Sequence, residues 1–195
     1  KNTIAAMSCN PAIGGLAKGQ IAREVDALGG LMGLATDATG IQFRMLNRSK
    51  GPAVQSPRAQ TDKHKYAAWM QQALEQTPNL TIIEVMATEI ITEANKVRAV
   101  TCKDGSVYAA QAVVVTTGTF LRGVMHIGPE QFSGGRVDEP ASEELSESLR
   151  KAGLEIGRLK TGTPHRLDPS TIDFDRLEIQ YGDKEPIPFS FMTER

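Results

Sequence analysis

The sequence predicts an α/β fold that combines amphipathic helices, a small antiparallel meander and one buried strand. Apolar residues recur with the helical period ahead of the glycine pair at residues 29–30 and again across residues 59–76. The dipeptide Asp104-Gly105 is the strongest hairpin signal in the chain. Three consecutive valines at residues 113–115 are typical of a strand buried on both faces. A chain of 195 residues is long enough for one domain with a substantial core.

The N-terminal segment places Cys9 in a polar turn, ahead of a glycine pair and a helix. Within this helix, Ile21, Val25 and Leu28 lie at positions i, i+4 and i+7 and form one apolar face. The free N–H groups and the dipole of a helix N-terminus favour an anion, and they make a nearby thiol more reactive. From the residues alone, Cys9 is either a reactive thiol or a small buried apolar residue.

A basic stretch follows a connector of some strand character at residues 31–40. Residues 41–57 carry Arg44, Arg48 and Lys50 and contain no acidic residue. One interpretation is a solvated loop. The other is a basic lip that binds the phosphate of a cofactor or of an RNA.

The middle of the chain predicts a helix followed by a meander. The helix covers residues 59–76, with Trp69 and Met70 on its core-facing side. The strands of the meander are predicted at residues 80–85, 88–93, 97–103 and 106–109. The next strand, residues 112–117, ends in small residues that let a ligand approach the backbone, as happens at the carboxyl ends of strands in open α/β sheets.

The rest of the chain alternates irregular segments with one helix and one strand. Residues 123–139 are glycine-rich and irregular. A helix is expected over residues 140–152, with Gly153 suited to the position after its C-cap. A strand is expected over residues 154–159. The basic, hydroxyl-rich turn at residues 160–164 either holds a phosphate or caps that strand.

Composition and charge argue against several classes of protein. The net charge of −1 does not indicate a nucleic-acid-binding protein by bulk electrostatics. No apolar run is long enough to span a membrane and no signal peptide is recognised, so no membrane partner is expected. The two cysteines lie too far apart in sequence to indicate a disulfide framework or a metal site, and the expected location is a reducing cytoplasm.

Seven strings of residues carry a family resemblance. They are MSCNPAIGGLAKGQIAREVDALGG (7–30), GIQFRMLNRSKGPAV (40–54), RAQTD (58–62), TTGTFLRG (116–123), SGGR (133–136), GRLKTGTP (157–164) and PFSF (188–191). In this order they resemble the MnmG (GidA) family of tRNA-modifying flavoproteins over nearly the whole chain. One departure is His165, where these relatives usually carry proline, and it leaves the motif intact.

The resemblance implies the fold in more detail. In glutathione-reductase-like flavoproteins, the order helix, strand, meander, buried strand and glycine-containing turn forms the second part of the FAD-binding domain. MnmG relatives begin with a strand–turn–helix unit whose G-x-G-x-x-G motif seats the FAD pyrophosphate, and this sequence contains no such motif. We therefore expect residues 1–195 to be a partial FAD-binding domain with a Rossmann-type sheet, which alone binds FAD poorly. Residues 180–195 are expected to cross toward an inserted domain.

The resemblance also implies an activity. The family uses FAD, NADH and 5,10-methylenetetrahydrofolate to place an aminomethyl or carboxymethylaminomethyl group on C5 of the wobble uridine of tRNA. Its members are homodimers that assemble with the GTPase MnmE into a heterotetramer. The NADH site is expected outside this chain, which alone is expected to be inactive.

Two alternatives to this activity stay open. One is the related folate- and FAD-dependent tRNA uracil-5-methyltransferase, which shares the fold and the cofactors. The other is a non-catalytic remnant of an FAD-binding domain that acts as an interaction module.

Site residues follow from the resemblance by position. Cys9 matches a family cysteine implicated in activity, and a thiolate that attacks C6 of a uracil activates C5. A second family cysteine lies beyond the end of this chain, so either of the two is the nucleophile. The residues expected near FAD are Asn10, Pro11, Gly14, Gly15, Ala87, Thr117, Gly118, Thr119 and Ser142. The candidates for contact with RNA or folate are Arg48, Lys50, Arg158 and Lys160, and no metal site is expected.

Overall fold

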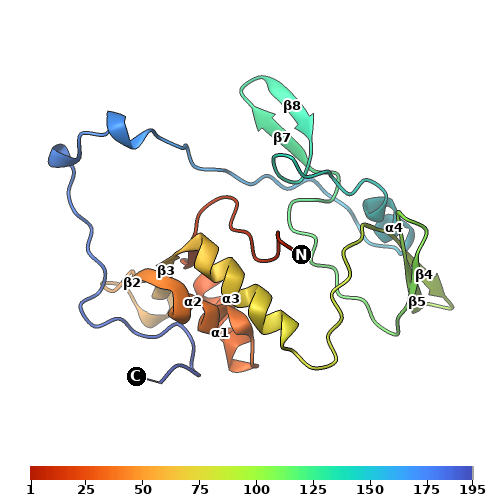
Figure 1. Ribbon diagram of the computed structural model, residues 1–195, viewed down its shortest axis with the longest axis horizontal. Coiled ribbons are helices and arrows are strands. Elements are labelled where there is room, and N and C mark those ends of the chain that lie inside the picture. The colour runs from red at the N-terminus through yellow and green to blue at the C-terminus, as the bar shows by residue number, and fades with distance from the viewer. Residues whose placement is uncertain (195) are drawn as a thin grey trace. The chain divides into compact units, whose positions relative to one another are not determined.

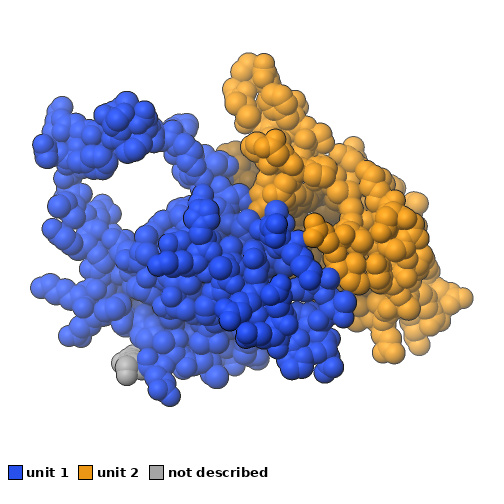
Figure 2. Space-filling view, viewed as in Figure 1, with its two compact units in different colours: residues 1–82, 162–195 blue, residues 83–161 orange. Residues whose placement is uncertain are grey.

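The computed structural model describes residues 1–194 and divides into two compact units (Figure 1). Figure 2 shows the first unit in blue, residues 1–82 with 162–195, and the second in orange, residues 83–161. The first unit is thus built from both ends of the chain, and the second is built from a continuous middle segment.

The first unit contains a three-stranded antiparallel sheet in the order β1-β3-β2. The strands are β1 (Ala12–Gly14), β2 (Gly40–Leu46) and β3 (Ser56–Thr61). Ala59 in the middle of β3 lies opposite Ile13 on one side and Phe43 on the other, and it is fully buried. The first part of the basic stretch is therefore a strand of this sheet, and the interpretation as a loop throughout is wrong.

Helix α1 (Lys18–Ala27) follows the glycine pair, as predicted. The residues of its predicted apolar face are exposed: Ile21 to 59%, Val25 to 47% and Leu28 to 91%. The buried side of the helix carries Ala22 and Asp26 instead. Hydrophobic periodicity therefore located the helix correctly, but the apolar face is not the side that packs in this unit.

Helix α2 (Leu31–Thr39) replaces the connector predicted for residues 31–40, so the strand character expected there is wrong. Ala35 and Thr36 have no exposed surface. The hydroxyls of Thr36 and Thr39 donate to carbonyls four residues earlier, at 2.7 and 2.6 Å. Five of its nine residues are Leu, Met or Ala, which favour a helix, and the burial of Ala35 and Thr36 adds tertiary support.

Helix α3 (Lys63–Glu75) begins later than predicted. Asp62 caps it, because its Oδ1 accepts hydrogen bonds from the backbone N of His64 at 3.0 Å and of Lys65 at 3.1 Å. The preceding residues 59–61 belong to β3, where they pair with residues of β1 and β2. The helix therefore starts directly after the last paired residues of β3.

Two carboxylates hold the C-terminal segment against α1 and α2. Asp26 Oδ2 accepts a hydrogen bond from Phe191 N at 2.7 Å. Asp37 accepts from Phe189 N at 2.7 Å and from Ser190 N at 2.9 Å. The bond to Phe191 explains why the charged Asp26 of α1 faces inward. The bonds to Asp37 hold Phe189 in the core, where 1% of its surface is exposed.

The core of the first unit joins the sheet, the three helices and the C-terminal segment. Its buried members are Ile13, Ala22, Ala35, Ala59, Tyr66 and Phe189. Trp69 and Met70 pack against this cluster, which confirms their prediction as core residues. The C-terminal segment also carries two short 3-10 helices, η2 (Pro169–Thr171) and η3 (Phe174–Arg176), while η1 (Pro52–Val54) lies between β2 and β3.

The second unit contains the predicted meander. Strands β4 (Ala87–Glu93), β5 (Lys96–Cys102) and β6 (Val107–Ala109) pair antiparallel in this order. The turn between β5 and β6 falls at Asp104-Gly105, where Gly105 has a φ of 85° and Asp104 Oδ1 accepts from Ser106 N at 3.0 Å. Turn chemistry therefore predicted this hairpin correctly.

Helix α4 (Leu145–Lys151) packs against β4, and Ser148 Oγ accepts a hydrogen bond from Ile90 N at 2.9 Å. It begins later than residue 140, the predicted start. Its end is as predicted: Gly153 has a φ of 89°, and Leu154 N donates to the carbonyl of Leu149 at 3.1 Å.

Three predicted strands are wrong, because residues 80–85, 112–117 and 154–159 are irregular. A strand requires a neighbouring strand to take its N–H and C=O groups. Within residues 1–194 no strand pairs with these segments. Val114 is 85% exposed, so the valine run is not buried on both faces here.

A hairpin occupies part of the segment predicted to be irregular. It consists of β7 (Val124–Ile127) and β8 (Glu130–Ser133), with Gly128 at a φ of 59° in the turn. The abundance of glycine around it concealed the alternation of the two short strands. Across the described part of the chain, no helix combines the length and the apolar character needed to cross a bilayer.

Candidate functional site

Cys9 is an exposed free thiol, and the C-terminal part of its own unit holds the loop that carries it. The Sγ atom donates to the carbonyl oxygen of Gly162 at 3.3 Å. Arg166 donates from Nη2 to the carbonyl oxygens of Ser8, at 3.0 Å, and of Cys9, at 2.6 Å. The interpretation of Cys9 as a buried apolar residue is therefore wrong, and the thiol is open to a reacting partner.

Backbone contacts to β3 fix the turn that follows the thiol. The predicted cofactor residues in this turn are Asn10, Pro11, Gly14 and Gly15. The carbonyl of Pro11 accepts from Thr61 N at 2.7 Å, and Gly15 N donates to the carbonyl of Pro57 at 2.9 Å. Gly14 has a φ of 92°, and a Cβ on it would lie 2.1 Å from the oxygen of Pro57. Only glycine fits this position, because β3 fills the space that a side chain would take, whereas a Cβ at Gly15 would meet nothing within 4 Å.

Lys18 opens α1 and lies close enough to Cys9 for their charges to interact. Its Nζ donates to the carbonyl of Ala12 at 3.2 Å. Burial lowers the pKa of Lys18, the neighbouring charge of Arg58 lowers it further, and the charge of Cys9 opposes both. The N-cap residue Ala17 supplies no side-chain cap, and the first N–H groups of α1 donate to backbone carbonyls instead: Lys18 N to Leu16 at 2.9 Å and Gly19 N to Gly15 at 2.7 Å. Lys18 is therefore the cation of this helix that lies near Cys9.

The other predicted cofactor residues lie in the second unit. Ala87 is the first residue of β4 and pairs with Cys102, which is buried. The turn at residues 117–119 has Gly118 at a φ of 57°, and Thr119 Oγ1 donates to the carbonyl of Gly135 at 2.7 Å. A turn of small residues at positive φ keeps its backbone open to a ligand.

Ser142 has a hydroxyl without a partner. The residue is 8% exposed, and its Oγ is buried and makes no hydrogen bond. Its backbone is fully engaged, because Ser142 N donates to Phe120 O and Ser142 O accepts from Arg122 N, both at 2.8 Å. A buried hydroxyl without a partner is costly. A polar ligand atom at this place would remove that cost, so Ser142 fits the role of a cofactor ligand.

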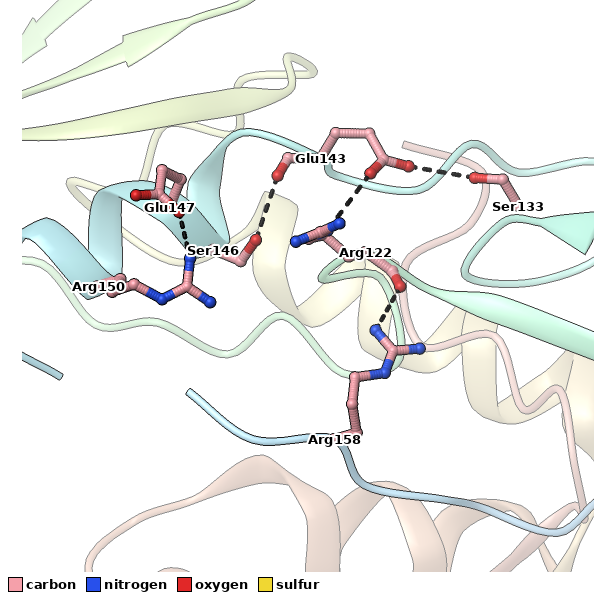
Figure 3. A network of polar contacts seen from close by, with 7 residues as sticks. All are labelled: Arg122, Ser133, Glu143, Ser146, Glu147, Arg150 and Arg158. Atoms are coloured by element: carbon pink, nitrogen blue, oxygen red, sulfur yellow. Dashed lines mark hydrogen bonds and ion pairs between the residues drawn. The ribbon is translucent and has the colours of Figure 1, made fainter. Parts of the chain in front are cut away.

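Two residues next to Ser142 belong to a network of polar contacts (Figure 3): Glu143, which follows it in the chain, and Arg122, which is bonded to its backbone. Glu143, the next residue, accepts from Ser133 Oγ at 3.2 Å, and its other oxygen lies 3.9 Å from Arg122 Nε. Figure 3 shows the guanidinium of Arg158 directed at the backbone of Arg122, and its Nη1 donates to that carbonyl at 2.8 Å. Arg158 thus serves this network, which is a role that sequence reasoning did not assign to it.

The remaining basic candidates differ in whether their side chains form an ion pair. Arg48 Nη2 forms an ion pair with Asp183 at 2.5 Å. Lys50 and Lys160 are exposed, and no ion pair of their side chains occurs among residues 1–194. Of the two candidates on the predicted basic lip, Arg48 and Lys50, Lys50 is the one that remains available for a phosphate.

Sequence reasoning missed Arg166 and Asp183, which hold Cys9 and Arg48. Both contacts join residues more than 130 positions apart. No spacing rule connects such pairs, although a basic and an acidic residue beside the motifs are visible in the sequence. No group of three or more metal-ligating side chains occurs within the described residues.

Comparison with known proteins places the whole chain in one family. The model of the family described as "Glucose inhibited division protein A" matches residues 1–195. A curated relative from Thermodesulfovibrio yellowstonii, named tRNA uridine 5-carboxymethylaminomethyl modification enzyme MnmG, is 56% identical over 193 residues. A relative of the same name from Geobacter sulfurreducens is 53% identical over 194 residues. These alignments cover 99% and 100% of the chain and 31% of each relative.

A solved structure agrees with these matches. The structure of Aquifex aeolicus GidA in its form I crystal superimposes with a TM-score of 0.91 at 54% identity, over 99% of this chain and 32% of that one. The predicted fold class is therefore confirmed: the chain has the α/β fold of part of a glutathione-reductase-like FAD-binding domain. The family resemblance predicted from the motifs is confirmed as well.

Proposed function

Because the chain belongs to the glucose inhibited division protein A family, we propose that it forms part of an FAD-dependent enzyme that modifies C5 of the wobble uridine in tRNA. The observation that carries this proposal is the match of the family over the entire chain. The names of the curated relatives support the reaction type, addition of a carboxymethylaminomethyl group to a uridine. The chain spans about 31% of those relatives, and the activity belongs to the longer protein of their kind.

In this proposal the residues of the second unit hold FAD. The unpartnered hydroxyl of Ser142, the open turn at residues 117–119 and the start of β4 at Ala87 fit a ligand that needs backbone access and a polar anchor. In the first unit, the backbone at Gly15 is the open part of the glycine pair, because a Cβ there would meet nothing within 4 Å. FAD would supply the redox chemistry of the transferred one-carbon unit.

Cys9 is the proposed nucleophile toward the uridine. Its thiolate forms a bond to C6, and the electrons of the C5–C6 double bond move to C5, which can then attack the one-carbon unit. Loss of the C5 proton and departure of the thiolate restore the double bond. Arg166 keeps the loop of Cys9 in place during these steps, and Lys18 contributes positive charge beside it.

The longer protein is proposed to need further components. NADH, bound outside this chain, supplies reducing equivalents, and 5,10-methylenetetrahydrofolate supplies the one-carbon unit. The homodimer assembles with the GTPase MnmE and meets its tRNA substrate in the cytoplasm. Lys50 and Lys160, exposed and without an ion pair in the described residues, are the proposed contacts to RNA or folate phosphates and carboxylates.

Nucleoside mass spectrometry of tRNA from a strain lacking the parent gene tests the proposed function. We expect the wobble uridine to lose its aminomethyl-type group, and a plasmid copy of the gene to restore it. Loss of a uracil methyl group instead would assign the protein to the methyltransferases. An unchanged nucleoside profile in a strain with a single copy of the gene would favour an interaction module without activity.

A further inference from the structure

Arg158 is connected to Ser142 through two consecutive hydrogen bonds. The first, drawn in Figure 3, runs from Arg158 Nη1 to the carbonyl of Arg122, and the second runs from Arg122 N to the carbonyl of Ser142. Both measure 2.8 Å. The guanidinium of an exposed arginine thus acts on the backbone of a residue whose own hydroxyl is buried and has no partner.

The loop between these residues depends on support. Arg122 has a φ of 42°, a left-handed conformation that is unfavourable for a residue with a side chain. The backbone of Ser142 bonds to Phe120 and to Arg122, on both sides of Leu121, which lies opposite Ser142 in a single parallel bridge. If the hydrogen bond to the Arg122 carbonyl is lost, the strained loop can relax, and the bridge that fixes Ser142 relaxes with it.

The side chains next to Ser142 reinforce the same arrangement. Glu143 Oε1 accepts from Ser133 Oγ, and Glu143 Oε2 lies near the guanidinium of Arg122. These contacts restrain the residue that follows Ser142 from the side opposite Arg158. Together they leave Ser142 Oγ as the one buried polar side-chain atom of this network without a hydrogen bond among the described residues.

We propose that Arg158 is a positioning residue for the cofactor: it holds the strained Arg122 loop and thereby fixes Ser142, whose hydroxyl binds a polar atom of FAD. This inference rests on the proposed function, since it assumes that the second unit holds FAD. It replaces direct contact with RNA or folate as the role of Arg158. Lys160, two residues away, keeps that other role.

FAD affinity of the full-length protein tests the proposal. The variant is Arg158→Gln, and the dissociation constant of FAD is measured by flavin fluorescence after reconstitution of the apoprotein. We expect binding to weaken about fivefold to tenfold, the loss typical of one net hydrogen bond, because Arg158 is exposed and acts on Ser142 indirectly. Arg158→Lys keeps a single donor and should weaken binding less. The matched control is Lys151→Gln, which removes an exposed cation at the end of α4 in the same unit and should leave FAD affinity unchanged.

A double-mutant cycle distinguishes positioning from general destabilisation. Ser142→Ala removes the hydroxyl that Arg158 is proposed to position. In that background, Arg158→Gln should weaken FAD binding less than about twofold further, because the two changes act on one contact. Fully multiplicative losses would overturn the proposal. If Arg158→Gln does not fold, the same cycle with Arg158→Lys decides in the same way.

Different results would contradict the role of Arg158 and the proposed function on which it rests. A wild-type protein that binds no FAD would contradict the proposed function itself. If the wild type binds FAD and Arg158→Gln binds it equally well, while tRNA affinity falls and its salt dependence flattens, Arg158 is an RNA contact and the positioning role is rejected.

Discussion

Asp183 holds Arg48 in place: Arg48 Nη2 lies 2.5 Å from Asp183 Oδ2, which also accepts a hydrogen bond from Met45 N at 2.8 Å. Burial raises the pKa of Asp183. The hydrogen bonds from Arg48 and Met45 N, with the charges of Arg48 and Arg44, outweigh burial, so the pKa lies below its ordinary value. The ion pair thus ties the C-terminal segment to β2 and occupies a cation that sequence reasoning had assigned to RNA or folate.

The first prediction concerns pH and Asp183→Asn. Because the folded pKa is depressed, the carboxylate contributes stability that is fully present above its unfolded pKa and is lost as the pH falls through the folded pKa. The variant should lower the free energy of unfolding by about 1 kcal/mol at neutral pH. Urea unfolding at several pH values measures this. The difference from the wild type should disappear at the acidic end, and a constant difference would contradict the assignment.

The second prediction compares alanine at the two glycines of the Cys9 turn. Both have φ near 90°, but a Cβ at Gly14 meets the oxygen of Pro57, whereas a Cβ at Gly15 meets nothing within 4 Å. Gly15→Ala should cost only the backbone strain of about 1–2 kcal/mol. Gly14→Ala should cost about 2–4 kcal/mol, because β3 must also move. Chemical denaturation of both variants measures the difference, and equal losses would show that the clash is relieved without cost.

The third prediction separates the two cysteines. Cys9→Ala should abolish tRNA modification while the flavin absorbance of the full-length protein stays unchanged, since the thiol acts on the uridine and not on FAD. Cys102→Ala is the matched control: this thiol is buried between β4 and β6 and should lower stability by about 1 kcal/mol without stopping modification. Full activity of Cys9→Ala would reject its role as the nucleophile.

The fourth prediction concerns Lys50 and RNA. Because Arg48 is bound to Asp183, Lys50→Gln should weaken tRNA binding more than Arg48→Gln does. It should also reduce the slope of log affinity against log salt concentration by about 0.7–0.9, the effect of one phosphate contact. Lys96→Gln, an exposed lysine at the start of β5, is the control and should change neither quantity. If Lys50→Gln leaves the salt dependence unaltered, the basic lip does not bind RNA.

Signals confined to a few neighbouring residues predicted part of the fold. The turn at Asp104-Gly105 depends on contacts within three residues, and so does the end of α1 at Gly29. Such features can be recognised because the residues that make them are adjacent in the chain. The long motifs, which include the loop of Cys9, predicted the family for the same reason.

Strands were predicted less well, because a strand depends on its partner. Residues 88–93 and 97–103 resemble residues 112–117 in their β-branched composition, yet only the first two pair here. Helix α2 was missed although five of its nine residues are Leu, Met or Ala: the segment is short and carries Gly33 and two threonines, and the burial of Ala35 and Thr36 that supports it is not recorded by any local pattern.

The sequence by itself determined the family, the α/β class, the meander and the identity of the residues around Cys9. Only the tertiary structure decided what these residues do to one another. Asp26 faces inward because Phe191, 165 positions later, donates to it, and Arg158 serves Ser142 through Arg122. The physical reason is that side-chain hydrogen bonds act over about 3 Å in space, and the distance along the chain does not limit them.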